Sequence, residues 1–150
     1  MSVLRLTIDS NLSDVSLIAV AINQICIHIG MNEIQASQVE LCIAEAATNA
    51  IRHAYHGQRG QTVSVAVSTE VDRLQIEVCD SGTPMPAEQI DRLIHGAEIV
   101  EVDGTDRALL KEGGRGLQII HNLMDEVTYI REESLNRMQL TKYILCDRMT

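Results

Sequence analysis

The chain has 150 residues and a formal net charge of −9, which suits one acidic domain with room for a substantial core. Apolar residues make up 45% of it and charged residues 22%, a composition typical of soluble globular proteins. An acidic chain without a basic stripe disfavours direct binding to nucleic acid or to an anionic membrane, and it favours a protein partner.

Four cysteines are widely separated, and none forms a CxxC pair or a cluster with histidine. Each lies inside an apolar run, which predicts buried free thiols in a reducing cytoplasm rather than a zinc site or a disulfide framework. The N-terminus has no signal region, and no apolar run is long enough to cross a bilayer. We therefore expect a cytoplasmic protein. The cysteines are Cys26, Cys42, Cys79 and Cys146.

The spacing of apolar residues predicts a mixed succession of strands and helices. Asp9 or Ser10 is expected to cap the first helix, Gly30 to end it, and Asn32 to cap the second. In chain order the predicted elements are a strand at 3–8, a helix at 11–29, a helix from 32 to about 55, strands at 62–69 and 73–80, a short helix at 87–95, a loop at 96–116, a helix at 117–124, and strands at 126–131 and 138–146.

This order places the sheet mainly in antiparallel pairs, with two long helices and one short helix available to cover a single face. We therefore predict an α+β fold, a two-layer sandwich with a mixed, mostly antiparallel sheet, in one domain covering residues 1–150. The loop at 96–116 contains five glycines and is longer than ordinary connections in compact domains. Loops of this length usually serve function, so we expect a lid.

The helix at 40–55 carries the first candidate site. Glu45 and Asn49 are four residues apart, so their side chains leave one face of the helix and nearly overlie each other. A carboxylate and an amide oxygen in such an arrangement suit a hard cation or a water molecule, although both side chains could simply face solvent at the helix edge. The residues expected on the buried face are Leu41, Ala44, Ala47, Thr48 and Ile51.

A second candidate is the Asp80-Ser81-Gly82 segment at the end of a predicted strand. An ionised carboxylate accepts hydrogen bonds and donates none, so a buried Asp80 would accept from the exocyclic amine of adenine and oppose the carbonyl of guanine. Gly82 would let the backbone approach the base closely. A plain turn is the alternative, because this short motif is common.

A third candidate is the glycine-rich segment Gly113-Gly114-Arg115-Gly116-Leu117, which leads directly into a helix. Backbone N–H groups at such a start form an anion site, and Lys111 or Arg115 could add charge against a phosphate. The pattern is not that of the phosphate loop GxxxxGK[ST], and no strand precedes it as a dinucleotide fold requires.

The order of the three motifs resembles the ATP-binding fold of the GHKL superfamily, also called the Bergerat fold. ELCIAEAATNAIRHAY looks like its N box, DSGTPMP like its first glycine box and EGGRGLQIIHNLMDEV like its second. The first and last of these are especially similar to the anti-sigma-factor serine/threonine kinases of the RsbW and SpoIIAB type. The resemblance covers nearly the whole chain.

The resemblance implies ATP and Mg²⁺ as cofactors and assigns roles to the motif residues. Asn49 would ligate Mg²⁺, Glu45 would act as general base toward a substrate serine, Asp80 would hold the adenine amine and Gly82 would lie under the base. The remaining candidate nucleotide-binding residues, around the lid and the following helix start, are Lys111, Gly113, Gly114, Arg115, Gly116 and Leu117.

Two positions depart from the family pattern. Glu112 stands where some members carry an arginine that reaches the terminal phosphate, so Lys111 or Arg115 would have to substitute. Pro84 stands where many members have a third glycine, which stiffens the entrance to the lid. His53, four residues beyond Asn49, could border the phosphates or simply occupy the helix face.

The resemblance implies a kinase that phosphorylates a serine of a STAS-domain antagonist and that also binds a sigma factor or another regulator. It also implies a homodimer, formed through the first strand and the nearby sheet surface. An ATP-gated module that sequesters a regulator without phosphoryl transfer is the main alternative, left open by Glu112. An ATPase fragment of a larger machine is a third, and it predicts steady ATP turnover without a protein substrate.

Overall fold

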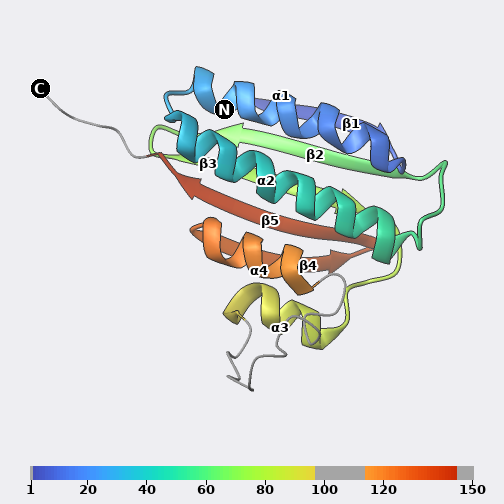
Figure 1. Ribbon diagram of the computed structural model, residues 1–150. Helices are drawn as coiled ribbons and strands as arrows, with labels where there is room; N and C mark the ends of the chain where they lie inside the picture. The colour runs from blue at the N-terminus through green and yellow to red at the C-terminus, as the bar shows by residue number, and fades with distance from the viewer. Residues whose placement is uncertain (1, 97–113, 145–150) are drawn as a thin grey trace, which may run out of the picture.

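The computed structural model describes residues 2–96 and 114–144. Its elements follow one another as a strand, two helices, two strands, two helices and two strands (Figure 1). They are β1 (Val3–Asp9), a 3₁₀ turn η1 (Leu12–Asp14), α1 (Val15–His28), α2 (Glu33–Asn49), a π-helical turn η2 (Ala50–Ala54), β2 (Thr62–Thr69), β3 (Arg73–Asp80), α3 (Ala87–His95), α4 (Gly114–Leu123), β4 (Glu126–Glu132) and β5 (Leu135–Tyr143).

The five strands form one sheet in the order β1-β2-β3-β5-β4, and every neighbouring pair is antiparallel. The helices α1, α2 and α4 lie over one face of this sheet, and α3 lies beside α4 (Figure 1). The predicted α+β fold with helices on one face is thus confirmed. In the described part of the chain, no helix combines the length and the apolarity that a bilayer crossing requires.

The core lies between the sheet and the helices. Alternate residues of β2 and β3 point toward the helices, because side chains of a strand alternate between its two faces. Three valines of β2 and the apolar residues of β3 that face α2 are almost completely buried. These are Val63, Val65, Val67, Leu74, Ile76 and Val78.

Three of the four cysteines are buried and free, as expected. Burial raises the pKa of the Cys26 thiol to about 11 and those of Cys42 and Cys79 to about 12, so all three are protonated at neutral pH. Cys146 lies outside the described residues.

The outward face of α2 differs from the prediction. Leu41 is 42% exposed, and together with Ala44 and Thr48 it lines a surface groove between α1 and α2. Ala47 and Ile51 are buried as predicted, and Ala46 and Ala50, which the prediction did not include, are buried with them. Small side chains let the helix pack closely on the strands, which the polarity pattern does not reveal.

Several predicted bounds are correct, because they depend on local signals. The strands at 62–69 and 73–80 and the helix at 87–95 have the predicted limits. Asn32 caps α2 by accepting a hydrogen bond from the backbone N–H of Gln35 at 2.8 Å. The cap predicted for the first helix is wrong, since Asn11 caps the η1 turn and the Ser10 hydroxyl donates to the Gln58 carbonyl.

The last two elements begin earlier than predicted. The helix α4 begins at Gly114 rather than at residue 117, so two glycines of the third motif lie inside its first turn. The strand β5 begins at Leu135 rather than at residue 138, because Glu133 and Ser134 form a tight turn with φ of 48° and 68°. Neither residue is a usual turn glycine. The lid expected at 96–116 falls largely in 97–113, outside the described residues.

Candidate functional site

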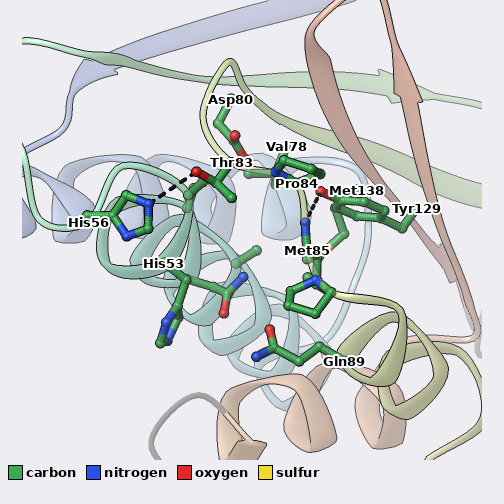
Figure 2. A pocket seen from close by; sticks show the side chains of 15 residues that line it. His53, His56, Val78, Asp80, Thr83, Pro84, Met85, Gln89, Tyr129 and Met138 are labelled. Atoms are coloured by element: carbon green, nitrogen blue, oxygen red, sulfur yellow. Dashed lines mark hydrogen bonds between the residues drawn. The ribbon is translucent and has the colours of Figure 1, made fainter.

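A cavity of about 220 Å³ opens at the C-terminal end of α2. Its wall combines the inner side of α2 and η2, the end of β3 with the loop that follows it, the start of α3, and one side chain each from β4 and β5 (Figure 2). These wall segments are far apart in sequence. Asn49 and Asp80 both line it, so the structure brings the first two candidate motifs to one site.

Asp80 is held at the end of β3 by two donors to the same oxygen. Its Oδ1 accepts from the backbone N–H of Gly82 at 2.9 Å and from Nδ2 of Asn136 at 2.8 Å. Within the described residues Oδ2 accepts no hydrogen bond, which leaves an acceptor at the cavity. Burial raises the pKa of the Asp80 carboxyl above its ordinary value, and these hydrogen bonds oppose the increase by stabilising the ionised form.

Asn136 is the site residue that sequence reasoning missed. Its side chain is completely buried, and Nδ2 also donates to the Gly82 carbonyl at 3.0 Å. It lies 56 positions from Asp80 and reaches it only because β5 pairs with β3, where Asn136 is directly opposite Asp80. The one available signal was a short polar residue just after the β4–β5 turn, and the late start predicted for β5 excluded it.

The turn after β3 is bonded to the end of η2. A Cβ on Gly82 would collide with the backbone carbonyl of Ala54, to which Thr83 donates its N–H at 2.9 Å. The hydroxyl of Tyr55 accepts from the N–H of Ser81 at 2.7 Å and donates to the carbonyl of Thr62 at 2.7 Å. The close approach that Gly82 permits in this structure is therefore to the protein backbone.

The turn η2 widens the last part of this long helix. The N–H of Tyr55 reaches back five residues to the Ala50 carbonyl at 3.0 Å, the bonding pattern of a π-helix. Such turns occur frequently at functional sites. His53 lies in this turn and lines the cavity, whereas the neighbouring Arg52 is exposed and lines the groove between α1 and α2.

Glu45 lies one turn before Asn49, outside the cavity wall, and its carboxylate touches the first turn of α4. A Cβ on Gly116 would come within 2.5 Å of Glu45 Oε2. Gly114 has more space, since its nearest neighbour would be Nη1 of Arg92 at 3.7 Å. The structure thus brings the third motif beside the first.

The other predicted site residues are placed as follows. Arg115 is exposed on the first turn of α4. The side chain of Leu117 is buried in the core, so any contact of this residue with a ligand would use its backbone. Pro84 lines the cavity. Lys111, Glu112 and Gly113 lie outside the described residues.

The kinase activity and the role of Glu45 that the family resemblance implies predict that Gly116→Ala slows phosphoryl transfer by roughly 100-fold, through displacement of the Glu45 carboxylate. The protein should remain folded, because the atom in the way is the end of a flexible side chain. The measurement is a double-mutant cycle on the transfer rate, in which Gly116→Ala adds little to Glu45→Gln. If Gly116 instead served the phosphates alone, Gly116→Ala would weaken ATP binding equally with Glu45 or Gln at position 45.

Comparison with known proteins agrees with this arrangement of sheet and helices. Residues 8–142 match the family model of the histidine kinase-like ATPase domain, and the chain belongs to that family. The class of domain is thus one that uses ATP.

The relatives narrow the class further. The serine-protein kinase RsbW of Listeria innocua is 29% identical over 130 residues, which is 87% of this chain and 80% of the relative. RsbW of Halalkalibacterium halodurans is 27% identical over 147 residues, 97% and 86% of the two chains, and RsbW of Bacillus subtilis is 27% identical over 135 residues, 90% and 81%. The protein is accordingly an RsbW-like member of the family, in the protein-serine/threonine kinase class.

Proposed function

We propose that this protein is a Mg²⁺-ATP-dependent serine kinase of a partner-switching system in the cytoplasm. The single domain at 1–150, with a lid at about 96–116, would phosphorylate a serine of a STAS-domain antagonist. The observation that carries the proposal is the placement of Glu45 and Asn49 on adjoining turns of α2, next to a cavity that also holds Asp80.

The residues present fit a magnesium ion that is shared with a nucleotide. Among the described residues no group of three or more His, Cys, Asp or Glu could hold a metal by itself. Mg²⁺ commonly takes one or two protein oxygens and completes its coordination with phosphates and water. Asn49, half-buried at the cavity, would be that protein ligand. When bound, the ion would neutralise charge on the phosphates.

The protein's own side chains would carry the remaining tasks. Asp80 would accept the adenine amine with Oδ2, and the first turn of α4, at Gly114 and Gly116, would present N–H groups to the phosphates. Glu45 would accept the proton of the substrate serine as its oxygen attacks the terminal phosphorus. The bond from that phosphorus to the bridging oxygen would break, and ADP would leave.

The proposed partners follow from the proposal of a partner-switching kinase. The antagonist is the substrate, and a sigma factor or another regulator competes with it for the kinase, which would act as a homodimer. Phosphorylation adds nearly two negative charges to the antagonist at neutral pH. Because the kinase carries a net charge of −9, added phosphate at their interface should weaken the complex.

The test is to capture interactors with and without Mg²⁺-ATP, and then to map phosphosites on any captured STAS-domain protein by mass spectrometry. We expect one phosphoserine, and release of the modified antagonist. Tight binding with an unchanged antagonist mass would contradict the kinase and would favour an ATP-gated binding module. Steady ATP hydrolysis without any protein would point to the ATPase of a larger machine.

A further inference from the structure

The last turn of α3 presents an arginine to the N-terminus of α4. Nη1 of Arg92 lies 3.7 Å from the position that a Cβ on Gly114 would occupy, so the guanidinium lies beside the first residue of α4. The first N–H groups of a helix have no partner within the helix and attract anions. Arg92 therefore adds a full positive charge at a place that already favours negative charge.

The position of Arg92 is fixed by contacts between the two helices. His121 of α4 bonds through Nδ1 to the Leu93 carbonyl at 3.1 Å, and its ring also lies against Gly96 at the end of α3. The two helices lie side by side (Figure 1). The last turn of α3 is thus attached to α4, which keeps the Arg92 backbone beside the start of that helix.

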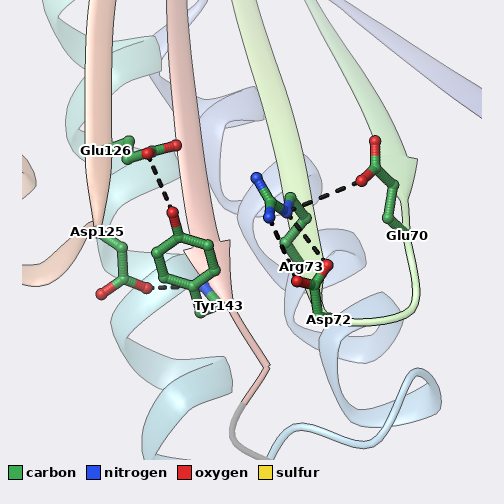
Figure 3. Close-up of polar contacts among 6 residues, drawn as sticks. All are labelled: Glu70, Asp72, Arg73, Asp125, Glu126 and Tyr143. Carbon is green, nitrogen blue, oxygen red and sulfur yellow. Dashed lines mark hydrogen bonds and ion pairs between the residues drawn. The ribbon is translucent and has the colours of Figure 1, made fainter.

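Arg92 is exposed and, like Arg52 and Arg115, has no protein partner among the described residues. Its guanidinium makes no hydrogen bond or ion pair within residues 2–96 and 114–144, whereas Arg73 bonds the Asp72 carboxylate at 3.1 Å and lies near Glu70 and over the Tyr143 ring (Figure 3). Arg137 is paired with Glu77. The donors of Arg92 are therefore available to a ligand.

The same face of α3 leads from the cavity to this arginine. Gln89 lines the cavity, and Arg92 follows it by three residues, so both side chains leave one side of the helix. Figure 2 places Gln89 on the side of the cavity away from Asp80, toward α4. A nucleotide whose base lies at Asp80 and whose phosphates run toward α4 would pass Gln89 before Arg92.

A positive charge is also needed at the first turn of α4 if a phosphate binds there. The Glu45 carboxylate lies against Gly116, two residues beyond Gly114. A phosphate at the first turn of α4 would be repelled by the Glu45 carboxylate. An adjacent guanidinium would offset this repulsion with its positive charge and could donate two parallel hydrogen bonds to the phosphate.

From these observations we infer that Arg92 binds the terminal phosphate of ATP. The inference rests on the proposed function and adds to it a residue that distinguishes ATP from ADP. With Arg92 in this role, neither Lys111 nor Arg115 is needed to contact the terminal phosphate, and α3 contributes directly to ATP binding.

The experiment measures the affinities of ATP and ADP, at constant Mg²⁺, for wild type and variants by titration calorimetry. We expect Arg92→Gln to weaken ATP binding by roughly 10- to 100-fold and ADP binding much less. Arg92→Lys keeps the charge but loses the planar fork of donors, so its ATP affinity should lie between those of wild type and Arg92→Gln. Arg52→Ala, an exposed arginine on another groove, should change neither affinity.

A thermal melt of each variant separates a folding defect from a binding one, and Arg92→Lys provides the same comparison if Arg92→Gln does not fold. An unchanged ratio of ATP to ADP affinity in the folded Arg92 variants would overturn the inference, as would a shifted ratio in Arg115→Ala alone. If wild type itself bound no ATP, the proposed function would fail instead, so the two failures are distinguishable.

Discussion

Replacing Glu45 by Gln is expected to slow phosphoryl transfer by roughly 100- to 10,000-fold and to leave ATP affinity nearly unchanged. Glutamine keeps the length and shape of glutamate but cannot take up the serine proton. The contact with Gly116 is preserved, and the side chain lies outside the cavity wall, so the nucleotide should still bind. The measurements are the single-turnover transfer rate to the cognate antagonist and the ATP dissociation constant.

Glu33→Gln is the matched control for this prediction. Glu33 is an exposed glutamate in the first turn of the same helix, so its replacement removes an equal charge at the far end of α2. Its transfer rate should equal that of wild type. A wild-type rate for Glu45→Gln would show that another group, or water, takes the proton.

Replacing Asp80 by Ala is expected to weaken ATP binding by roughly 100-fold, because a hydrogen bond to a half-buried charged acceptor is lost. Asp80→Asn should weaken ATP at least as much, because its amide oxygen must accept from Gly82 and Asn136 and its NH₂ group then faces the adenine amine. The same variant should reduce the preference for ATP over GTP, since an amide can donate to the guanine carbonyl. Asp72→Ala, an exposed carboxylate just before β3, is the control.

The pH dependence of ATP binding should also reveal the contribution of Asp80. Burial raises the pKa of Asp80, so this carboxylate becomes protonated at a higher pH than an exposed aspartate. The ionised acceptor is present above that pKa and lost below it, so ATP affinity should fall as the pH decreases through the raised pKa. Asp80→Asn should lack this decrease. Undiminished ATP affinity in Asp80→Ala would refute the assignment of the base contact.

Local signals along the chain were sufficient for much of the fold. Alternation of apolar and polar residues defined β2 and β3, and the cap at Asn32 marked the start of α2, because each depends on residues only a few positions apart. The spacing of Glu45 and Asn49 likewise predicts a shared helix face without any tertiary information.

Contacts between distant segments could not be predicted from these local signals. The bond from Asn136 to Asp80 exists only through the pairing of β5 with β3, and Arg92 approaches Gly114 only because α3 packs beside α4. Leu41 belongs to the outer surface for a related reason, since the phase of α2 was decided by how closely its alanines pack on the sheet.

Local patterns thus predict the order of the elements, the helix face that carries Glu45 and Asn49, and the resemblance to a family. Which groups surround these residues follows from the three-dimensional packing: the amide that holds Asp80, the glycine against Glu45 and the arginine at the start of α4. The physical reason is that propensity, capping and periodicity act within a few residues, whereas packing and strand pairing join residues that are tens of positions apart.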